Sequence, residues 1–297
     1  MPPVSDNALR RLDLPVMRRL EGLLQGDHRS AARGDGLDLA DLREYQLHDD
    51  VRRMDWNATA RLGAAHVRDY IEDREIAVWL LLDMSPSMTF AGVSISKHAV
   101  LTEFTTLMCR LLLGRGNRAG VMIFRDRIER TIPARGGRRQ LLAILNAVAG
   151  AHAGGRAGAT DLKQVLTDAA AVIRRRALVF LVSDFISPPG WEQALVPLAM
   201  RHDVIAVRLT DPLETRLPDL GFMTFQDAET GEQLFVDTHD RAFRDRFAAA
   251  AGARDARLRA AFEKAGVDVV ELATEDDVMD ALMRFSQMRK ASLRRSA

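Results

Sequence analysis

From Ile76 onward, short apolar runs alternate with amphipathic segments. The run IAVWLLLD at 76–83 is apolar until its final aspartate, which is typical of a strand buried on both faces of a sheet. ALVFLVSD at 177–184 repeats this pattern. The apolar runs at 119–124, 204–209 and 267–272 predict three further buried strands.

Apolar residues at intervals of three and four predict helices between these strands. The clearest such segment is 95–113, which Gly114 ends. Similar spacing predicts helices at 138–148, 161–175, 191–201 and about 239–265. The stretch Thr274 to Asp277 fits a capping box that opens a last helix.

Alternation of strands and helices predicts an α/β fold, a doubly wound and mostly parallel sheet with helices on both faces. We expect 128–134 to form an edge strand and 222–238 a hairpin. The main domain spans 75–285 in this interpretation, followed by a basic tail at 286–297. Residues 1–74 are more polar and form an N-terminal segment packed on the domain, with a helix at Pro15–Leu24.

Composition narrows the function classes. The 297 residues are 47% hydrophobic and carry a formal charge of +1. The net charge therefore favours neither nucleic acid nor a membrane surface as a partner. No apolar run is long enough to span a bilayer, and the single cysteine, Cys109, excludes an internal disulfide. We expect a soluble, cytoplasmic protein in which Cys109 is buried and inert.

The candidate chemistry lies where two predicted strands end. Asp83, Ser85 and Ser87 follow the first buried strand, Thr160 precedes a helix, and Asp184 ends the fourth strand. In a doubly wound order such as 3-2-1-4-5-6, the first and fourth strands are neighbours at the switch point where ligands bind. Carboxylate and hydroxyl oxygens at this point make a partial shell for a hard cation.

Each of these residues also has a purely structural interpretation, because Asp, Ser and Thr at strand ends cap helices and turns. An enzyme is the other alternative. A phosphotransferase could use Asp83 as a nucleophile, but position 85 is then expected to be Asp rather than Ser. The chain contains no P-loop, no G-x-S-x-G and no zinc-type histidine spacing.

The D-x-S-x-S segment, the loop threonine and the strand-end aspartate resemble the metal-ion-dependent adhesion site of von Willebrand factor A domains, over about 75–285. The resemblance implies that Mg²⁺, or alternatively Mn²⁺ or Ca²⁺, is held by Asp83, Ser85, Ser87, Thr160 and Asp184. Such sites keep one coordination position for an acidic side chain of a partner protein. Pro86 departs mildly from the usual pattern.

The segment 41–61 together with D-x-S-x-S resembles a bacterial domain-of-unknown-function family encoded beside MoxR-type AAA+ ATPases. Segments 211–221 and 227–238 match it too, whereas His48 replaces a usual glycine. The matching residues in 41–61 are Arg43, Tyr45, Asp50, Arg52, Asp55, Trp56 and Arg61. The resemblance implies an adaptor or co-chaperone of such an ATPase, acting on an unknown client protein. From the missing catalytic motifs we expect that the chain is not an enzyme.

Two interpretations remain for the charged residues of 41–61. In the structural one, Trp56 packs beneath an ion-pair network that fastens the N-terminal segment to the domain. This network consists of Asp49, Asp50, Arg52, Arg53 and Asp55. In the functional one, the same surface docks the ATPase.

Overall fold

A computed structural model describes residues 38–46, 49–71, 77–90, 95–114, 116–151, 160–226 and 232–296. The described residues up to Ile71 belong to one compact unit and those from Ala77 onward to a second, larger one. The helix predicted at Pro15–Leu24 lies outside the described residues. No described helix is both long enough and apolar enough to cross a membrane.

The smaller unit contains an antiparallel pair of strands, β1 (Asp38–Glu44) and β2 (His66–Ile71). A short 3₁₀ turn, η1 (Val51–Arg53), and a helix, α3 (Trp56–Leu62), connect them. The helix begins where the Asp55 carboxylate accepts hydrogen bonds from two backbone N–H groups, and it ends at Gly63, which adopts a left-handed φ of 71°.

One detail of the structural interpretation of 41–61 is wrong. Trp56 is 67% exposed, so it does not pack beneath the charged residues. Asp50 and Asp55 accept hydrogen bonds from backbone N–H groups at the starts of η1 and α3, respectively, because carboxylates bind the orphan donors of a first turn. Arg43 and Asp49 do form an ion pair, with 2.6 Å between nitrogen and oxygen.

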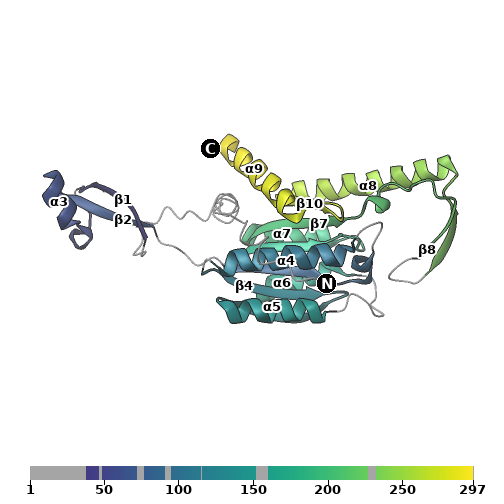
Figure 1. Ribbon diagram of the computed structural model, residues 1–297, viewed down its shortest axis with the longest axis horizontal. Helices are drawn as coiled ribbons and strands as arrows, with labels where there is room; N and C mark the ends of the chain where they lie inside the picture. Colours follow the sequence, from purple (N-terminus) through teal and green to yellow (C-terminus); the bar gives the residue numbers. More distant parts are fainter. Residues whose placement is uncertain are drawn as a thin grey trace. The chain divides into compact units, whose positions relative to one another are not determined.

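The larger unit is built on a six-stranded sheet (Figure 1). Its strands are β3 (Ala77–Asp83), β4 (Arg118–Phe124), β5 (Ile128–Arg135), β6 (Leu178–Ser183), β7 (Asp203–Thr210) and β10 (Asp268–Ala273). Their order across the sheet is β10-β7-β6-β3-β4-β5, and every pairing is parallel except that of β4 with β5. The predicted parallel strands and the edge strand at 128–134 are confirmed.

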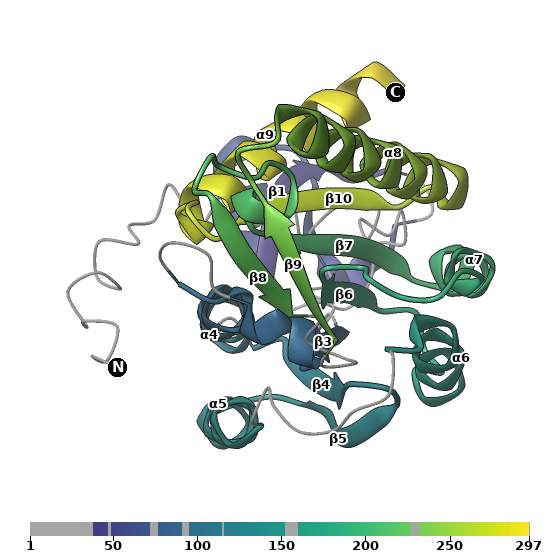
Figure 2. The ribbon, with the colours of Figure 1, turned by 90° about the vertical axis from the view of Figure 1, so that its right-hand side faces the viewer.

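Helices cover both faces of this sheet, as predicted (Figure 2). One face carries α4 (Lys97–Leu113), α5 (Arg138–Gly150) and α9 (Val278–Ser296). The other carries α6 (Leu162–Val172), α7 (Trp191–Arg201) and α8 (Arg241–Ala265). The central strands β3 and β6 are buried almost throughout, which explains their unbroken apolar runs.

A second antiparallel pair, β8 (Phe222–Gln226) and β9 (Gln233–Asp237), confirms the predicted hairpin strands. Its base is joined to the start of α8, where Arg244 forms an ion pair with Asp219 and donates a hydrogen bond to the backbone carbonyl of Thr238. The turn predicted within this hairpin lies outside the described residues.

The capping box predicted at Thr274 is wrong. Asp277 caps α9 instead, because its carboxylate accepts a hydrogen bond from the Asp280 N–H at 3.0 Å. The Thr274 hydroxyl donates to the carboxylate of Asp211 at 2.9 Å. Tertiary pairing with the loop after β7 thus outcompetes local capping at this threonine.

Candidate functional site at the carboxyl ends of β3 and β6

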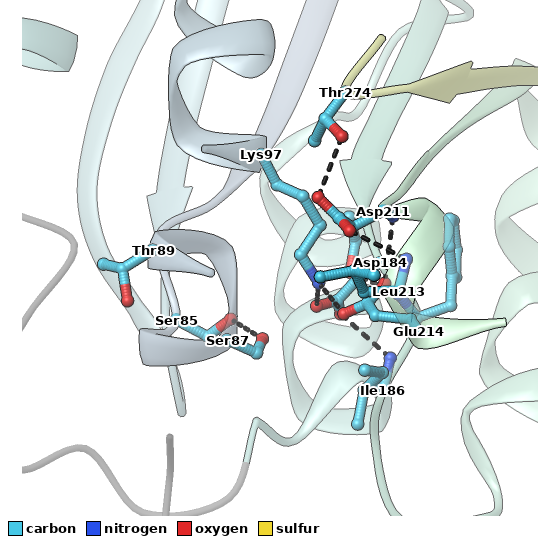
Figure 3. Close-up of polar contacts among 12 residues, drawn as sticks. Ser85, Ser87, Thr89, Lys97, Asp184, Ile186, Asp211, Leu213, Glu214 and Thr274 are labelled. Atoms are coloured by element: carbon cyan, nitrogen blue, oxygen red, sulfur yellow. Dashed lines mark hydrogen bonds and ion pairs between the residues drawn. The ribbon is translucent and has the colours of Figure 1, made fainter. Parts of the chain in front are cut away.

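Asp83 is the last residue of β3, and its side chain is fully buried. Its Oδ1 accepts a hydrogen bond of 2.9 Å from the Ser85 N–H, so the chain turns immediately after the strand. A 3₁₀ turn, η2 (Pro86–Thr89), then begins with proline, whose fixed φ suits a first turn. The hydroxyl oxygens of Ser85 and Ser87 lie 3.0 Å apart within this loop (Figure 3).

The neighbouring strand β6 reaches Asp83 through Ser183. Its hydroxyl donates to Asp83 Oδ2 at 2.6 Å and accepts from the Phe185 N–H at 2.9 Å. Phe185 has a positive φ of 58°, which is uncommon for a side chain of this size. Its ring packs against Trp191 and Phe262, with centroids 5.5 and 5.0 Å away. This packing fixes the turn that carries Asp184.

Thr160 lies at the start of α6 and is buried. Its backbone carbonyl accepts a hydrogen bond of 2.6 Å from the Ser187 hydroxyl, and Ser187 Oγ in turn accepts from the Leu162 N–H at 3.2 Å. The loop before α6 is therefore tied to the loop that follows Asp184. The structure thus ties each predicted ligand into the loops at this edge of the sheet.

Lys97, which is not one of the predicted ligands, lies against Asp184 (Figure 3). Its ammonium donates to Asp184 Oδ2 at 2.7 Å and to Glu214 Oε1 at 2.6 Å. Lys97 is the first residue of α4 and is 0% exposed. A lysine at a helix start reads as a surface residue in the sequence, and no local pattern reveals two acids that lie 87 and 117 residues away.

Glu214 is held firmly in place. It closes a capping box in the 3₁₀ turn η3 (Pro212–Glu214), where its Oε2 accepts from the Asp211 N–H at 3.2 Å. Asp211 accepts a hydrogen bond from the Leu213 N–H at 2.9 Å as well as from Thr274. The spacing D-x-x-E from Asp211 to Glu214 is a sequence signal for such a cap, and the sequence analysis did not use it. No local sequence signal indicates the contact between Glu214 and Lys97.

The cluster carries excess negative charge. Burial, and secondarily the charge of Asp184, raise the pKa of Asp83 to about 7, although hydrogen bonds from Ser183 and Ser85 oppose the rise. Burial lowers the pKa of Lys97, but the attraction of Asp184 and Glu214 outweighs it and leaves that pKa above its ordinary value. Lys97 is thus a fixed positive charge facing two carboxylates.

The donor set fits a hard divalent cation. Asp83, Ser85 and Ser87 present oxygen ligands from one loop, and a cation would compensate the negative charge that burial makes costly on Asp83. Each carboxylate oxygen of Asp83 accepts at least one hydrogen bond, from the Ser85 N–H or from the Ser183 hydroxyl. Among the described residues, no three His, Cys, Asp or Glu side chains gather as a metal site. The predicted ligand set itself contains only two such side chains.

Fold and site together define an α/β protein with a buried cluster of carboxylates and hydroxyls at the switch point of a mostly parallel sheet. The chain belongs to the DUF58 family of proteins of unknown function, whose profile matches residues 41–257. This match includes the 41–61 segment and the whole candidate site.

Relatives in mycobacteria share most of the chain. An uncharacterized protein of Mycobacterium tuberculosis is 36% identical over 288 residues, which cover 95% of this chain and 89% of that protein. An uncharacterized protein of Mycobacterium bovis gives the same values. An uncharacterized protein of Mycobacterium avium is 33% identical over 159 residues, or 54% of this chain and 94% of that protein.

Two solved structures resemble the fold at low sequence identity. The conserved hypothetical protein BatB of Bacteroides thetaiotaomicron is 15% identical, with a TM-score of 0.47, and the match covers 72% of this chain and 99% of that chain. An aerotolerance-related membrane protein of Bacteroides fragilis is 13% identical, with the same TM-score, and the match covers 71% and 97%.

Proposed function

We propose that the chain is a protein-binding adaptor whose site, like that of a von Willebrand factor A domain, depends on a divalent cation. One observation carries the proposal. Asp83 and Ser183, from the ends of neighbouring strands, are hydrogen-bonded in one buried cluster that also contains the Ser85 and Ser87 hydroxyls and borders Asp184. The sequence separation of 100 residues between Asp83 and Ser183 makes this a product of the fold rather than of a local turn.

In this proposal Mg²⁺, or alternatively Mn²⁺ or Ca²⁺, would be held by Asp83, Ser85, Ser87, Thr160 and Asp184, directly or through water. The bound cation supplies an electrophilic position that accepts a Glu or Asp side chain of a partner. Two carboxylates and three hydroxyls leave more positive charge on the cation than an all-carboxylate shell does. This balance favours binding of a further carboxylate.

The same geometry favours binding over catalysis. A nucleophilic aspartate must reach its substrate, whereas Asp83 is fully buried and each of its oxygens accepts a hydrogen bond. We therefore propose that the chain is not an enzyme. The partner we propose is a MoxR-type AAA+ ATPase in the cytoplasm, with a chaperone-like action on a client protein. This part of the proposal rests on the resemblance of the 41–61 segment.

The test uses the full chain and two measurements. Isothermal titration with MgCl₂ and MnCl₂ measures metal binding, and capture of the purified MoxR-type ATPase, in Mg²⁺ and again in EDTA, measures partner binding. Asp83→Ala is expected to abolish both. Asp245→Ala, at an α8 carboxylate whose side chain is 71% exposed, is the matched control and should change neither. Capture of the ATPase that persists in EDTA and in Asp83→Ala would overturn the metal-dependent mechanism.

One observation favours a second candidate, a scaffold that binds its partner without metal. The Lys97 ammonium already neutralises Asp184, so the cluster is partly compensated by the chain itself. Under this alternative, Asp83→Ala leaves capture of the ATPase intact while titration detects no metal binding to the native chain.

A further inference from the structure

Lys97 joins three loops at the carboxyl edge of the sheet. Its ammonium contacts Asp184 after β6 and Glu214 after β7. Its backbone N–H donates to the carbonyl of Phe90 at 3.3 Å, which ties the start of α4 to the residue that follows η2. A buried, fully charged lysine is costly unless carboxylates compensate it, and here two carboxylates lie at ion-pair distance.

Asp184 is consequently engaged on both oxygens. Oδ1 accepts from the Ile186 N–H at 3.0 Å, and Oδ2 accepts from Lys97 at 2.7 Å. A cation that approaches Asp184 meets a fixed positive charge within hydrogen-bond distance of one of the oxygens it needs. The ammonium and the cation repel each other and compete for the same lone pairs.

We propose that Lys97 is an internal cation that competes with the divalent metal for Asp184 and thereby sets the metal affinity of the site. This inference rests on the proposed function and names a residue that regulates the same site. Lys97 is a positioning residue: it acts on the metal through Asp184.

Glu214 is a second carboxylate that the Lys97 ammonium can pair with when a metal binds Asp184. Because Lys97 contacts Asp184 and Glu214 at once, the ammonium can keep Glu214 when Asp184 turns towards a metal. The capping box holds Glu214 where it is, so this second partner persists. Neutralising Glu214 leaves Lys97 with Asp184 alone, which strengthens its hold on the ligand and weakens metal binding.

The experiment measures Mn²⁺ affinity by calorimetry and the rise in melting temperature caused by Mn²⁺, with the metal alone as the probe. Four full-length proteins are compared: native, Lys97→Met, Glu214→Gln and Lys163→Met. Methionine keeps the length and the apolar stem of lysine without its charge. Lys163 is exposed on α6, so Lys163→Met is the matched control.

Lys97→Met should bind Mn²⁺ at least tenfold more tightly than the native protein and show a larger rise in melting temperature. Glu214→Gln should bind about tenfold more weakly, and Lys163→Met should match the native protein. If Lys97→Met does not fold without metal, Glu214→Gln decides the question, and equal or tighter binding by Glu214→Gln overturns the inference.

The remaining outcomes separate the inference from the proposed function. Equal or weaker affinity in Lys97→Met overturns the role of Lys97, while Mn²⁺ binding by the native protein still supports the metal site. Binding in Lys97→Met but not in the native protein supports the role of Lys97 and overturns metal dependence of the native chain. Absence of binding in every variant overturns both.

Discussion

At the scale of single residues, Ser183 connects the two central strands of the site. Its hydroxyl donates to Asp83 and accepts from the Phe185 N–H, and both bonds are buried. Ser183→Ala leaves a carboxylate oxygen and a backbone N–H without these partners. We expect a loss of about 1–3 kcal/mol in the free energy of unfolding, because buried unsatisfied groups are costly. Urea unfolding measures it, and an unchanged midpoint would contradict the arrangement.

Cys109 provides a chemical test of the core at the same scale. The thiol is buried in α4, and burial raises its pKa to about 12. We expect no alkylation of the native protein at pH 8, because only the thiolate reacts. In guanidinium the same thiol should react at the rate of an ordinary cysteine. Mass spectrometry after iodoacetamide treatment reads out both states, and rapid labelling of the native protein would show that the α4 core is open.

The sequence predicted single residues unevenly, for a physical reason. Asp83 and Asp184 could be paired because each ends an apolar strand and the strand order brings them together. The contacts of Lys97 could not be predicted, because its two partners lie on other loops and its neighbours in the sequence are those of an ordinary surface helix start. The prediction that Trp56 is packed was wrong for a related reason. An aromatic residue next to charged residues suggests packing, and only the fold shows that Trp56 is 67% exposed.

At the scale of elements, apolar continuity predicted the parallel strands well, since a strand buried on both faces leaves an unbroken apolar signature. The end of a helix was harder to predict. At 274–277 three residues could cap α9, and the sequence favoured Thr274. The structure uses Asp277, because the loop after β7 engages Thr274 in a hydrogen bond with Asp211. Local capping rules fail where a tertiary partner competes.

The contact between β3 and β4 makes an element-scale prediction. These strands are paired so that Trp79 lies beside Gly120, and a Cβ at Gly120 would lie 2.8 Å from the Trp79 ring and 2.9 Å from the backbone nitrogen of Ala134. Neither neighbour can move freely in a buried sheet. We expect Gly120→Ala to lower the free energy of unfolding by about 1–3 kcal/mol, as overpacking does.

Gly252 supplies the control for this prediction. It lies within α8, where an added Cβ meets nothing within 4 Å. Gly252→Ala should raise the free energy of unfolding by about 0.4–1 kcal/mol, because alanine restricts the unfolded chain and favours the helix. Thermal unfolding of both variants checks the pair. Stabilisation by Gly120→Ala would contradict the close approach of β3 and β4.

At the scale of the whole molecule, the site is a consequence of strand order. In the sheet, β3 lies between β6 and β4. The chain runs from β3 to β4 and β5 on one side and through β6 and β7 to β10 on the other, so the loops after β3 and β6 meet at the point where the strand order reverses. Lys97 and Glu214 add α4 and the loop after β7 to the same point. Loops that are distant in sequence are thus positioned by the same sheet. A substitution that disturbs the packing of this sheet should therefore also disturb the geometry of the site.

The pH dependence of global stability gives a further prediction at this scale. His202 ends α7 and is buried; burial, and secondarily the charge of Arg201, lower its pKa below 6.5. The unfolded chain therefore takes up a proton at this residue before the folded one does. The contribution of His202 to stability is fully present above pH 6.5 and is lost as the pH falls through the unfolded value towards the lower folded one.

Replacing this histidine by a side chain that does not titrate tests the direction of its contribution to the pH dependence of stability. His202→Gln should unfold with a flatter dependence on pH between about 5 and 7 than the native protein, the slopes differing by at most about 1.4 kcal/mol per pH unit. Urea unfolding at several pH values measures the difference, and carboxylates that titrate in both proteins cancel from it. Identical slopes would mean that His202 keeps an ordinary pKa in the folded chain, and a steeper loss of stability in the variant would mean that the fold raises that pKa.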